Sequence, residues 1–341
     1  MSGCFPVDEQ NCKVHTGRMR KVVAILITPL IFFLTSFQND VGKEIVKWPE
    51  RQFEPRRENF GTLRELGRKL FYDPSISGDG TISCASCHSP YHSFAHSDHR
   101  LSHGIHDSIG LRNAPSLLNL AWHNYFMWDG AIHHLKAVPL APLHHQGEMA
   151  SSVSHALHAV NESPQYRHWL LEQNLYPVDT DIFTEAIAVF LSSLVSNNSR
   201  YDKMNRGDIV FDPQEQKGYD LFVQHCNRCH TEPLFTSGGV ERNGLGVDSV
   251  LRDFGVERIT RDTADHLKFK VPTLRNLLYS SPYMHDGRFQ NLGEVIRHYG
   301  CDDSSPLSEK LSAEERTDIA VFLKTLNDSS FVFNPKNHYI Y

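Results

Sequence analysis

Two short clusters of cysteine and histidine constrain this chain more than any other feature. They read CASCH at 84–88 and CNRCH at 226–230. Two thiols at this spacing, on one turn of helix, reach both vinyl groups of a porphyrin, and the adjacent imidazole can then bind its iron. The sequence therefore predicts two covalently bound c-type haems, held by Cys84, Cys87 and His88 and by Cys226, Cys229 and His230.

Other uses of these cysteines fit the pattern less well. A structural zinc site would bring two Cys-x-x-Cys pairs together, but here the pairs are far apart in the chain and each is followed by histidine. A thioredoxin-like motif requires a βαβ context, which the surrounding sequence lacks. The other cysteines, Cys4, Cys12 and Cys301, do not form a disulfide framework.

The segments around the two clusters repeat in the same order. Gly-x-x-Leu-Phe begins at Gly67 and again at Gly218, before each CxxCH. Pro-x-Leu then follows at Pro115 and at Pro272, and an aromatic-Met-x-Asp-Gly phrase follows at 126–130 and 283–287. Three blocks that recur in order indicate an internal duplication.

Helical periodicity dominates the body of the chain. Apolar residues recur at helical spacing from 63 to 71 and from 182 to 194, and Ser312 before two glutamates predicts the start of a helix through Leu323. The polar segment 196–213 is the expected join between domains. We expect an all-α fold of two cytochrome c-like haem domains, at 45–200 for the first haem and 205–330 for the second.

The N-terminus has the pattern of a targeting segment. Residues 1–21 form an extension with a basic end, and 22–38 form an apolar stretch interrupted by Pro29. This stretch predicts a secretory signal peptide or an N-terminal membrane anchor, and Met19 is a candidate start. The body of the chain is therefore expected outside the cytoplasm, in the periplasm. The net charge of −6 argues against a nucleic-acid partner.

The order of these motifs resembles the bacterial di-haem cytochrome c peroxidase family, including its MauG-like members. The resemblance spans about 45–330 and rests on CASCH, RNAPSLLN, FMWDG, CNRCH, FKVPTLRN and PYMHDGRF. It implies an all-α fold with a haem on either side of a domain interface, and often a homodimer. It also implies an electron relay at Trp128 between the haems, although a core aromatic is the plainer interpretation of that residue. Finally, it implies a calcium ion held by Asn113, Ser280 and Pro282.

The two copies of the repeated phrase lead into different residues. Seven positions past the final leucine stands Pro142 in the first copy and Tyr299 in the second. A phenolate can bind iron, whereas a proline side chain has no lone pair to offer. We therefore expect Tyr299 to bind the iron of the second haem, with Met284 as the alternative ligand, and the first haem to keep an open face. In having tyrosine at this position, the chain resembles the MauG-like members.

Residues near the open face are assigned by the resemblance. Glu148 matches the family's distal glutamate, which would act as general acid and base on peroxide. Val138 departs from the family's usual glutamine and puts the rate or peroxide access in doubt. His103 and His106 flank, without matching, the position of a gating histidine, and surface imidazoles are the plainer interpretation of both.

Three functions are compatible with this interpretation. The first is an exported peroxidase that reduces H2O2 with electrons from a small cytochrome or cupredoxin, delivered through the second haem to the first. The second is a MauG-like oxidase that modifies aromatic side chains of a protein. The third is a di-haem electron-transfer cytochrome without enzymatic activity, which would require both irons to carry two strong protein ligands.

Overall fold

The structure of this chain is a computed structural model that describes residues 45–97, 99–307 and 309–338. The N-terminal extension at 1–21 and the signal or anchor at 22–38 lie outside the described residues. Within the described ranges, no helix combines the length and the apolar character that crossing a bilayer requires.

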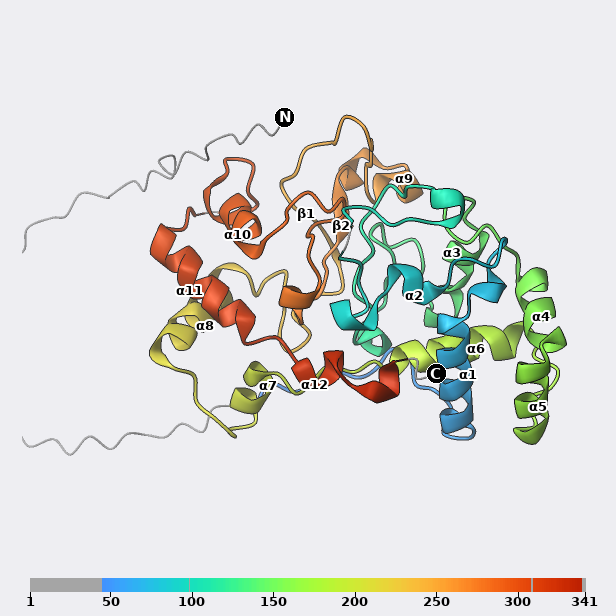
Figure 1. Cartoon of the computed structure of the whole chain (residues 1–341). Helices are drawn as coiled ribbons and strands as arrows, with labels where there is room; N and C mark the ends of the chain where they lie inside the picture. Colours follow the sequence, from blue (N-terminus) through green and yellow to red (C-terminus); the bar gives the residue numbers. More distant parts are fainter. Residues whose placement is uncertain (1–44, 98, 308, 339–341) are drawn as a thin grey trace, which may run out of the picture.

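The fold is mainly helical, as predicted, with a single small sheet in the described part of the chain. The elements of the first half (described residues up to 194) are α1 (Phe60–Tyr72), α2 (Cys84–Cys87), α3 (Leu140–His144), α4 (Val153–Glu162), α5 (Pro164–Glu172) and α6 (Thr180–Ser192). In Figure 1 these helices lie on the right, with α4 and α5 outermost.

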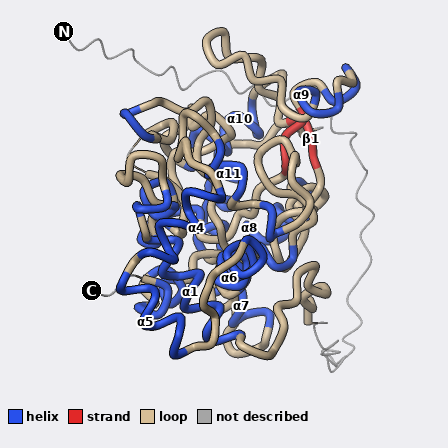
Figure 2. Tube along the Cα trace, turned by 90° about the vertical axis from the view of Figure 1, so that its right-hand side faces the viewer, coloured by secondary structure: helices blue, strands red, loops and turns tan. Residues whose placement is uncertain are grey.

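The second half, from residue 195 onward, contains the remaining elements. They are α7 (Arg200–Asn205), α8 (Pro213–His225), β1 (Val240–Arg242), α9 (Glu257–Thr260), β2 (Lys268–Lys270), α10 (Leu292–Cys301), α11 (Ala313–Lys324) and α12 (Ser329–Val332). β1 and β2 pair antiparallel, with Glu241 opposite Phe269. Loops make up much of the chain around this sheet, as Figure 2 shows.

A pair of crossed helices recurs in each half with the same close contact. A Cβ atom on Gly67 of α1 would lie 1.9 Å from the carbonyl oxygen of Ala186 in α6. In the second half, a Cβ on Gly218 of α8 would lie 2.0 Å from the carbonyl oxygen of Asp318 in α11. Only glycine allows backbones to approach this closely. The matching geometry supports the predicted internal duplication.

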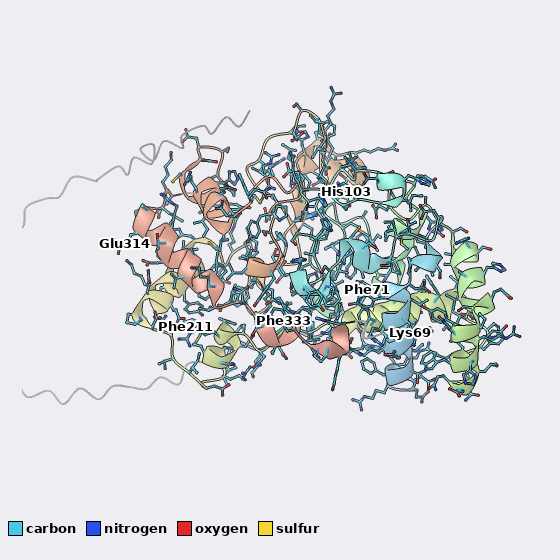
Figure 3. The ribbon with its side chains drawn as sticks, in the orientation of Figure 1. Lys69, Phe71, His103, Phe211, Glu314 and Phe333 are labelled. Atoms are coloured by element: carbon cyan, nitrogen blue, oxygen red, sulfur yellow. The ribbon has the colours of Figure 1, made fainter. Side chains whose placement is uncertain are left out.

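Each crossed pair builds its own hydrophobic core. Phe71 and Phe190 pack at a ring distance of 5.2 Å in the first core, and Phe222 and Phe322 pack at 5.0 Å in the second. Figure 3 places Phe71 in the first half and Phe211 in the second. Near the C-terminus, Phe331 and Val332 return to the first core.

Two asparagines of the repeated motifs hold the halves together. Asn119 Nδ2 donates to the carbonyl oxygen of Ser196 (3.2 Å), and Asn276 Nδ2 donates to the hydroxyl of the same serine (3.1 Å). That hydroxyl in turn donates to the carboxylate of Asp328 (3.2 Å). Buried polar groups need such partners. The equivalent asparagines therefore meet on one serine at the join between the halves.

Candidate functional site

The two CxxCH segments share one backbone geometry despite different settings. The first lies on α2, and the backbone N–H of His88 donates to the carbonyl oxygen of Cys84 (2.9 Å). The second begins at the C-cap of α8 and continues as a turn, in which His230 N–H donates to the carbonyl oxygen of Cys226 (2.9 Å). The expected helical turn is thus present in the first segment, and the second closes the same bond between its first cysteine and its histidine at the end of α8.

The imidazoles of both segments are oriented by backbone carbonyls. Nδ1 of His88 lies 2.9 Å from the carbonyl oxygen of Phe94. Nδ1 of His230 lies 3.2 Å from the carbonyl oxygens of both Phe235 and Pro272. Donation from Nδ1–H to a carbonyl fixes the tautomer that leaves Nε2 as the nitrogen able to bind a metal. The same tautomer is therefore favoured at both histidines.

Two phenylalanines adopt a rare backbone conformation to provide these acceptors. Phe94 has φ 58° and Phe235 has φ 54°, in the left-handed region that bulky residues seldom occupy. Such conformations persist where the surrounding structure requires them, often at functional sites. The sequence interpretation missed both residues. Their only signal was a phenylalanine five or six positions after each CxxCH histidine.

The side chains of both segments are largely surrounded by protein but keep some accessible surface. Burial lowers the pKa of His88 and of His230 to about 4 and raises the pKa of Cys84 and of Cys226 to about 12. All four side chains nevertheless keep partial exposure. Neutral imidazoles and paired thiols that keep accessible surface fit a covalently attached haem.

The structure places Glu148 beside the first segment. Its negative charge contributes to the raised pKa values of the Cys84 and Cys87 thiols. Burial raises the pKa of Glu148 itself, against the opposing charge of His145, whose Nδ1 lies 3.6 Å from Oε1 of Glu148. The Glu148 carbonyl accepts from the N–H of Ile105 (2.8 Å), which fixes the loop. The carboxyl group is thus held near the first site in an environment that favours protonation.

The segments that come after the repeated phrase differ between the halves. In the second half α10 is a single ten-residue helix from Leu292 to Cys301. In the first half the equivalent stretch is broken after Ala137, and Pro139 precedes the short α3. Pro142 lies within α3, where its carbonyl oxygen accepts from the N–H of Met149 (3.2 Å).

Tyr299 lies beside the second segment. Its pKa is raised well above the ordinary value, first by burial and then by the electrostatic effect of the nearby Cys229 and Cys226 side chains. The side chain keeps partial exposure, as those of the CxxCH residues do. A tyrosine therefore lies near the second segment, where a glutamate lies near the first.

Trp128 lies where the two halves meet. Its Nε1 donates to the carbonyl oxygen of Asn113 (2.8 Å), and its carbonyl oxygen accepts from the N–H of Lys270 (2.7 Å). Its ring meets the ring of His285, the equivalent residue of the second half, edge-on at 6.5 Å. The indole of Trp128 therefore contacts both halves of the chain at the join between them.

Met284 and Met127 share a backbone conformation, with φ 74° and 64°. Each begins a turn that ends in a hydrogen bond from a glycine, Gly287 or Gly130, to the methionine carbonyl (3.2 and 3.3 Å). The shared turn gives both methionines the same local role. Met284 as an iron ligand stays a prediction.

The two candidate gating histidines lie in one loop next to the first segment. The thiol of Cys87 donates to the carbonyl oxygen of His103 (3.5 Å), and Nδ1 of His103 pairs with the carboxylate of Asp107 (2.8 Å). The side chain of His106 is 76% exposed and lies 3.7 Å from Asp79. His103 therefore approaches the site through its backbone, while His106 faces solvent.

The residues expected to hold calcium have other contacts. Asn113 Nδ2 donates to the carbonyl oxygen of Arg100 (3.1 Å), and its backbone N–H donates to that of His285 (2.8 Å). Ser280 follows the short helix 277–279, and Pro282 follows a cis peptide bond. The calcium site stays a prediction.

Comparisons with known proteins agree with this geometry. Residues 62–209 match the family model described as di-haem cytochrome c peroxidase. Cytochrome c551 peroxidase of Nitrosomonas europaea is 34% identical, over 77% of this chain and 79% of the relative. Methylamine utilization protein MauG of Methylorubrum extorquens is 33% identical, over 76% and 77%.

A solved structure extends the likeness to the fold. The crystal structure of a MauG-like protein associated with microbial copper homeostasis superposes with a TM-score of 0.75 at 28% identity, over 89% of this chain and 99% of that one. Together with the oriented histidines and paired thiols, these matches show that the chain belongs to the di-haem cytochrome c peroxidase family.

Proposed function

We propose that the protein is an exported peroxidase that reduces H2O2 to water with electrons from a small redox protein. The observation that carries this proposal is the asymmetry of the two sites. A carboxyl group that titrates stands near Cys84 and Cys87, and a phenol stands near Cys226 and Cys229. Relatives named as cytochrome c peroxidases support the reaction class.

The two haems would be held by the residues of the CxxCH segments, with His88 and His230 as the histidines that would bind their irons. When bound, the haems would supply the redox chemistry and the position where peroxide binds. Around the first site, Oε1 of Glu148 would take a proton from peroxide and return it to the departing oxygen. Its raised pKa suits both transfers, because a group that titrates closer to neutral pH can both accept and donate.

Tyr299 and Trp128 would determine the path that electrons take to the first haem. Tyr299 would close the second iron to small ligands, so that this centre transfers electrons only. Trp128, at the join, would relay electrons from the second haem to the first. We further propose a calcium ion at Asn113, Ser280 and Pro282, and a periplasmic location; the segment 22–38 would direct export.

Steady-state assays with a reduced small cytochrome test this function. Rapid turnover with H2O2, together with an EPR spectrum in which one iron accepts cyanide and the other does not, is the expected result. If neither iron binds cyanide in any redox state, the peroxidase function is excluded and an electron carrier is the remaining function.

A second candidate is a MauG-like oxidase that modifies aromatic side chains of a protein. Tyr299 favours it, because an anionic oxygen ligand stabilises the ferric state and lowers the potential at which the second haem accepts electrons. Negligible turnover with reduced cytochrome, combined with peroxide-dependent oxidation of added tyrosine- or tryptophan-containing protein, would identify this activity instead.

A further inference from the structure

His123 is buried without a hydrogen-bonding partner on its ring. The residue is only 4% exposed, and neither Nδ1 nor Nε2 has a partner within the described part of the chain. Its pKa is lowered well below the ordinary value, first by burial and then by the positive charge of Lys270. A buried imidazole that faces a cation and no acceptor is unfavourable unless another group completes the site.

Lys270 lies in a similar environment. It ends β2, where successive side chains point to opposite faces, and its neighbour Phe269 stacks on His285 at 3.8 Å. Burial alone lowers the pKa of Lys270 to about 8, and no carboxylate among the described residues contributes to it. The ammonium group is thus partly buried, with no carboxylate partner among the described residues.

Lys270 has a degree of exposure similar to that of the two CxxCH histidines. Like His88 and His230, its side chain keeps partial exposure although burial shifts its pKa. Lys270 also stands two residues before Pro272, whose carbonyl oxygen lies 3.2 Å from Nδ1 of His230. The strand that carries this lysine therefore leads directly to the second site.

We propose that His123 and Lys270 together bind a carboxylate, namely a propionate of the haem held by Cys226, Cys229 and His230. An ammonium group and an imidazole N–H are the donors that a buried carboxylate needs, and each would gain the partner that it lacks. The inference rests on the covalent haem loading of the proposed function and adds a binding role for two residues outside the ligand set.

The pair occurs once in the duplicated fold. By the repeat that relates 126 to 283, the position of Lys270 corresponds to Asn113 and that of His123 corresponds to Ser280. The positive charge is therefore placed at one of two equivalent positions. A nearby cation favours the reduced iron, which carries one positive charge fewer. It opposes the effect of an anionic Tyr299 ligand on the potential of the same haem.

Redox titration of the holoprotein tests the proposal, with each haem followed by its own optical and EPR signal. Lys270→Met should lower the reduction equilibrium constant of the second haem at least tenfold, or about 59 mV for one electron. Lys270→Arg should preserve it. Lys268→Met is the matched control, because Lys268 lies on the same strand and pairs with Asp265 at 3.0 Å. A pyridine haemochrome spectrum confirms two haems per chain, so that failed loading is distinguished from a failed proposal.

The contrary results are equally specific. Unchanged potentials in Lys270→Met, or a change confined to the first haem, would overturn the assignment. If the shift in reduction potential disappears when acetate in the buffer is exchanged for a bulky anion, the two residues bind a free carboxylate and not the haem propionate.

If Lys270→Met does not load both haems, the resonance Raman spectrum of the wild-type protein tests the proposal. Propionate bending bands that do not move between H2O and D2O would show that no N–H donor binds the carboxylate. His123→Leu should reduce this isotope shift, and His134→Leu, an exposed control, should not.

Discussion

The N–H of Lys270 donates a 2.7 Å hydrogen bond to the carbonyl oxygen of Trp128. This bond joins β2 of the second half to the backbone of Trp128 in the first. Because the Trp128 ring also meets His285 edge-on, the indole is fixed from both sides. If electrons pass between the halves as proposed, we expect them to pass through this aromatic contact.

Trp128→Phe should slow electron transfer between the haems while the fold is retained. The smaller ring loses the Nε1 hydrogen bond to Asn113 and part of the contact to the second half. We expect a decrease of about tenfold or more in the rate, equivalent to about 1.4 kcal/mol in the barrier. Stopped-flow reduction followed at each haem measures it. Trp169→Phe, remote from the join, is the control, and equal rates in the two variants would exclude the relay.

Glu148→Gln should reduce peroxide turnover by about 10²–10⁴-fold, the usual contribution of a general acid–base group. Peroxide must lose a proton to the ionised carboxylate, so activity falls as the pH drops through the pKa of Glu148. Because burial raises that pKa, the loss should begin at a higher pH than for an ordinary glutamate. The pH profile of kcat/KM should lose this acidic limb in the variant. Glu172→Gln, an exposed change in α5, should keep it.

Tyr299→Met should raise the midpoint potential of the second haem, because a thioether favours the ferrous state and a phenolate the ferric state. A tenfold change in the reduction equilibrium corresponds to about 59 mV, and we expect at least that. Spectroelectrochemistry gives the value. Tyr283→Phe removes only the hydroxyl that donates to Leu277 (2.9 Å) and should leave the potential unchanged. A potential that does not respond to Tyr299→Met would rule out the tyrosine as ligand.

Gly67→Ala and Gly218→Ala should each destabilise the protein by about 1–3 kcal/mol, the usual cost of overpacking. The added methyl groups would lie 1.9 and 2.0 Å from carbonyl oxygens of the crossing helices. Gly61→Ala is the matched control within α1, since nothing lies within 4 Å of its Cβ position. That variant should be stabilised by about 0.5–1 kcal/mol through helix propensity. Urea unfolding of the holoproteins measures all three, and equal midpoints for Gly61→Ala and Gly67→Ala would contradict the packing argument.

The sequence by itself determined the class of fold and the number of haem sites. CxxCH works through local covalent spacing, and helical periodicity is likewise local, so both are readable along the chain. The helix predicted after Ser312 is confirmed as α11, capped by that serine, and the apolar segment from 182 is confirmed as α6. The repeat of motifs predicted a duplication, and the matching contacts of the two crossed helix pairs support it.

Only the tertiary structure decided which residues complete the sites. The carbonyl groups of Phe94 and Phe235 act through backbone geometry, which leaves no mark on residue type. His123 and Lys270 come from opposite halves of the chain, and their proximity exists only after the halves pack together. The electrostatic effect of such a partner depends on which groups are buried away from water, and burial is set by the folded structure rather than by the local sequence.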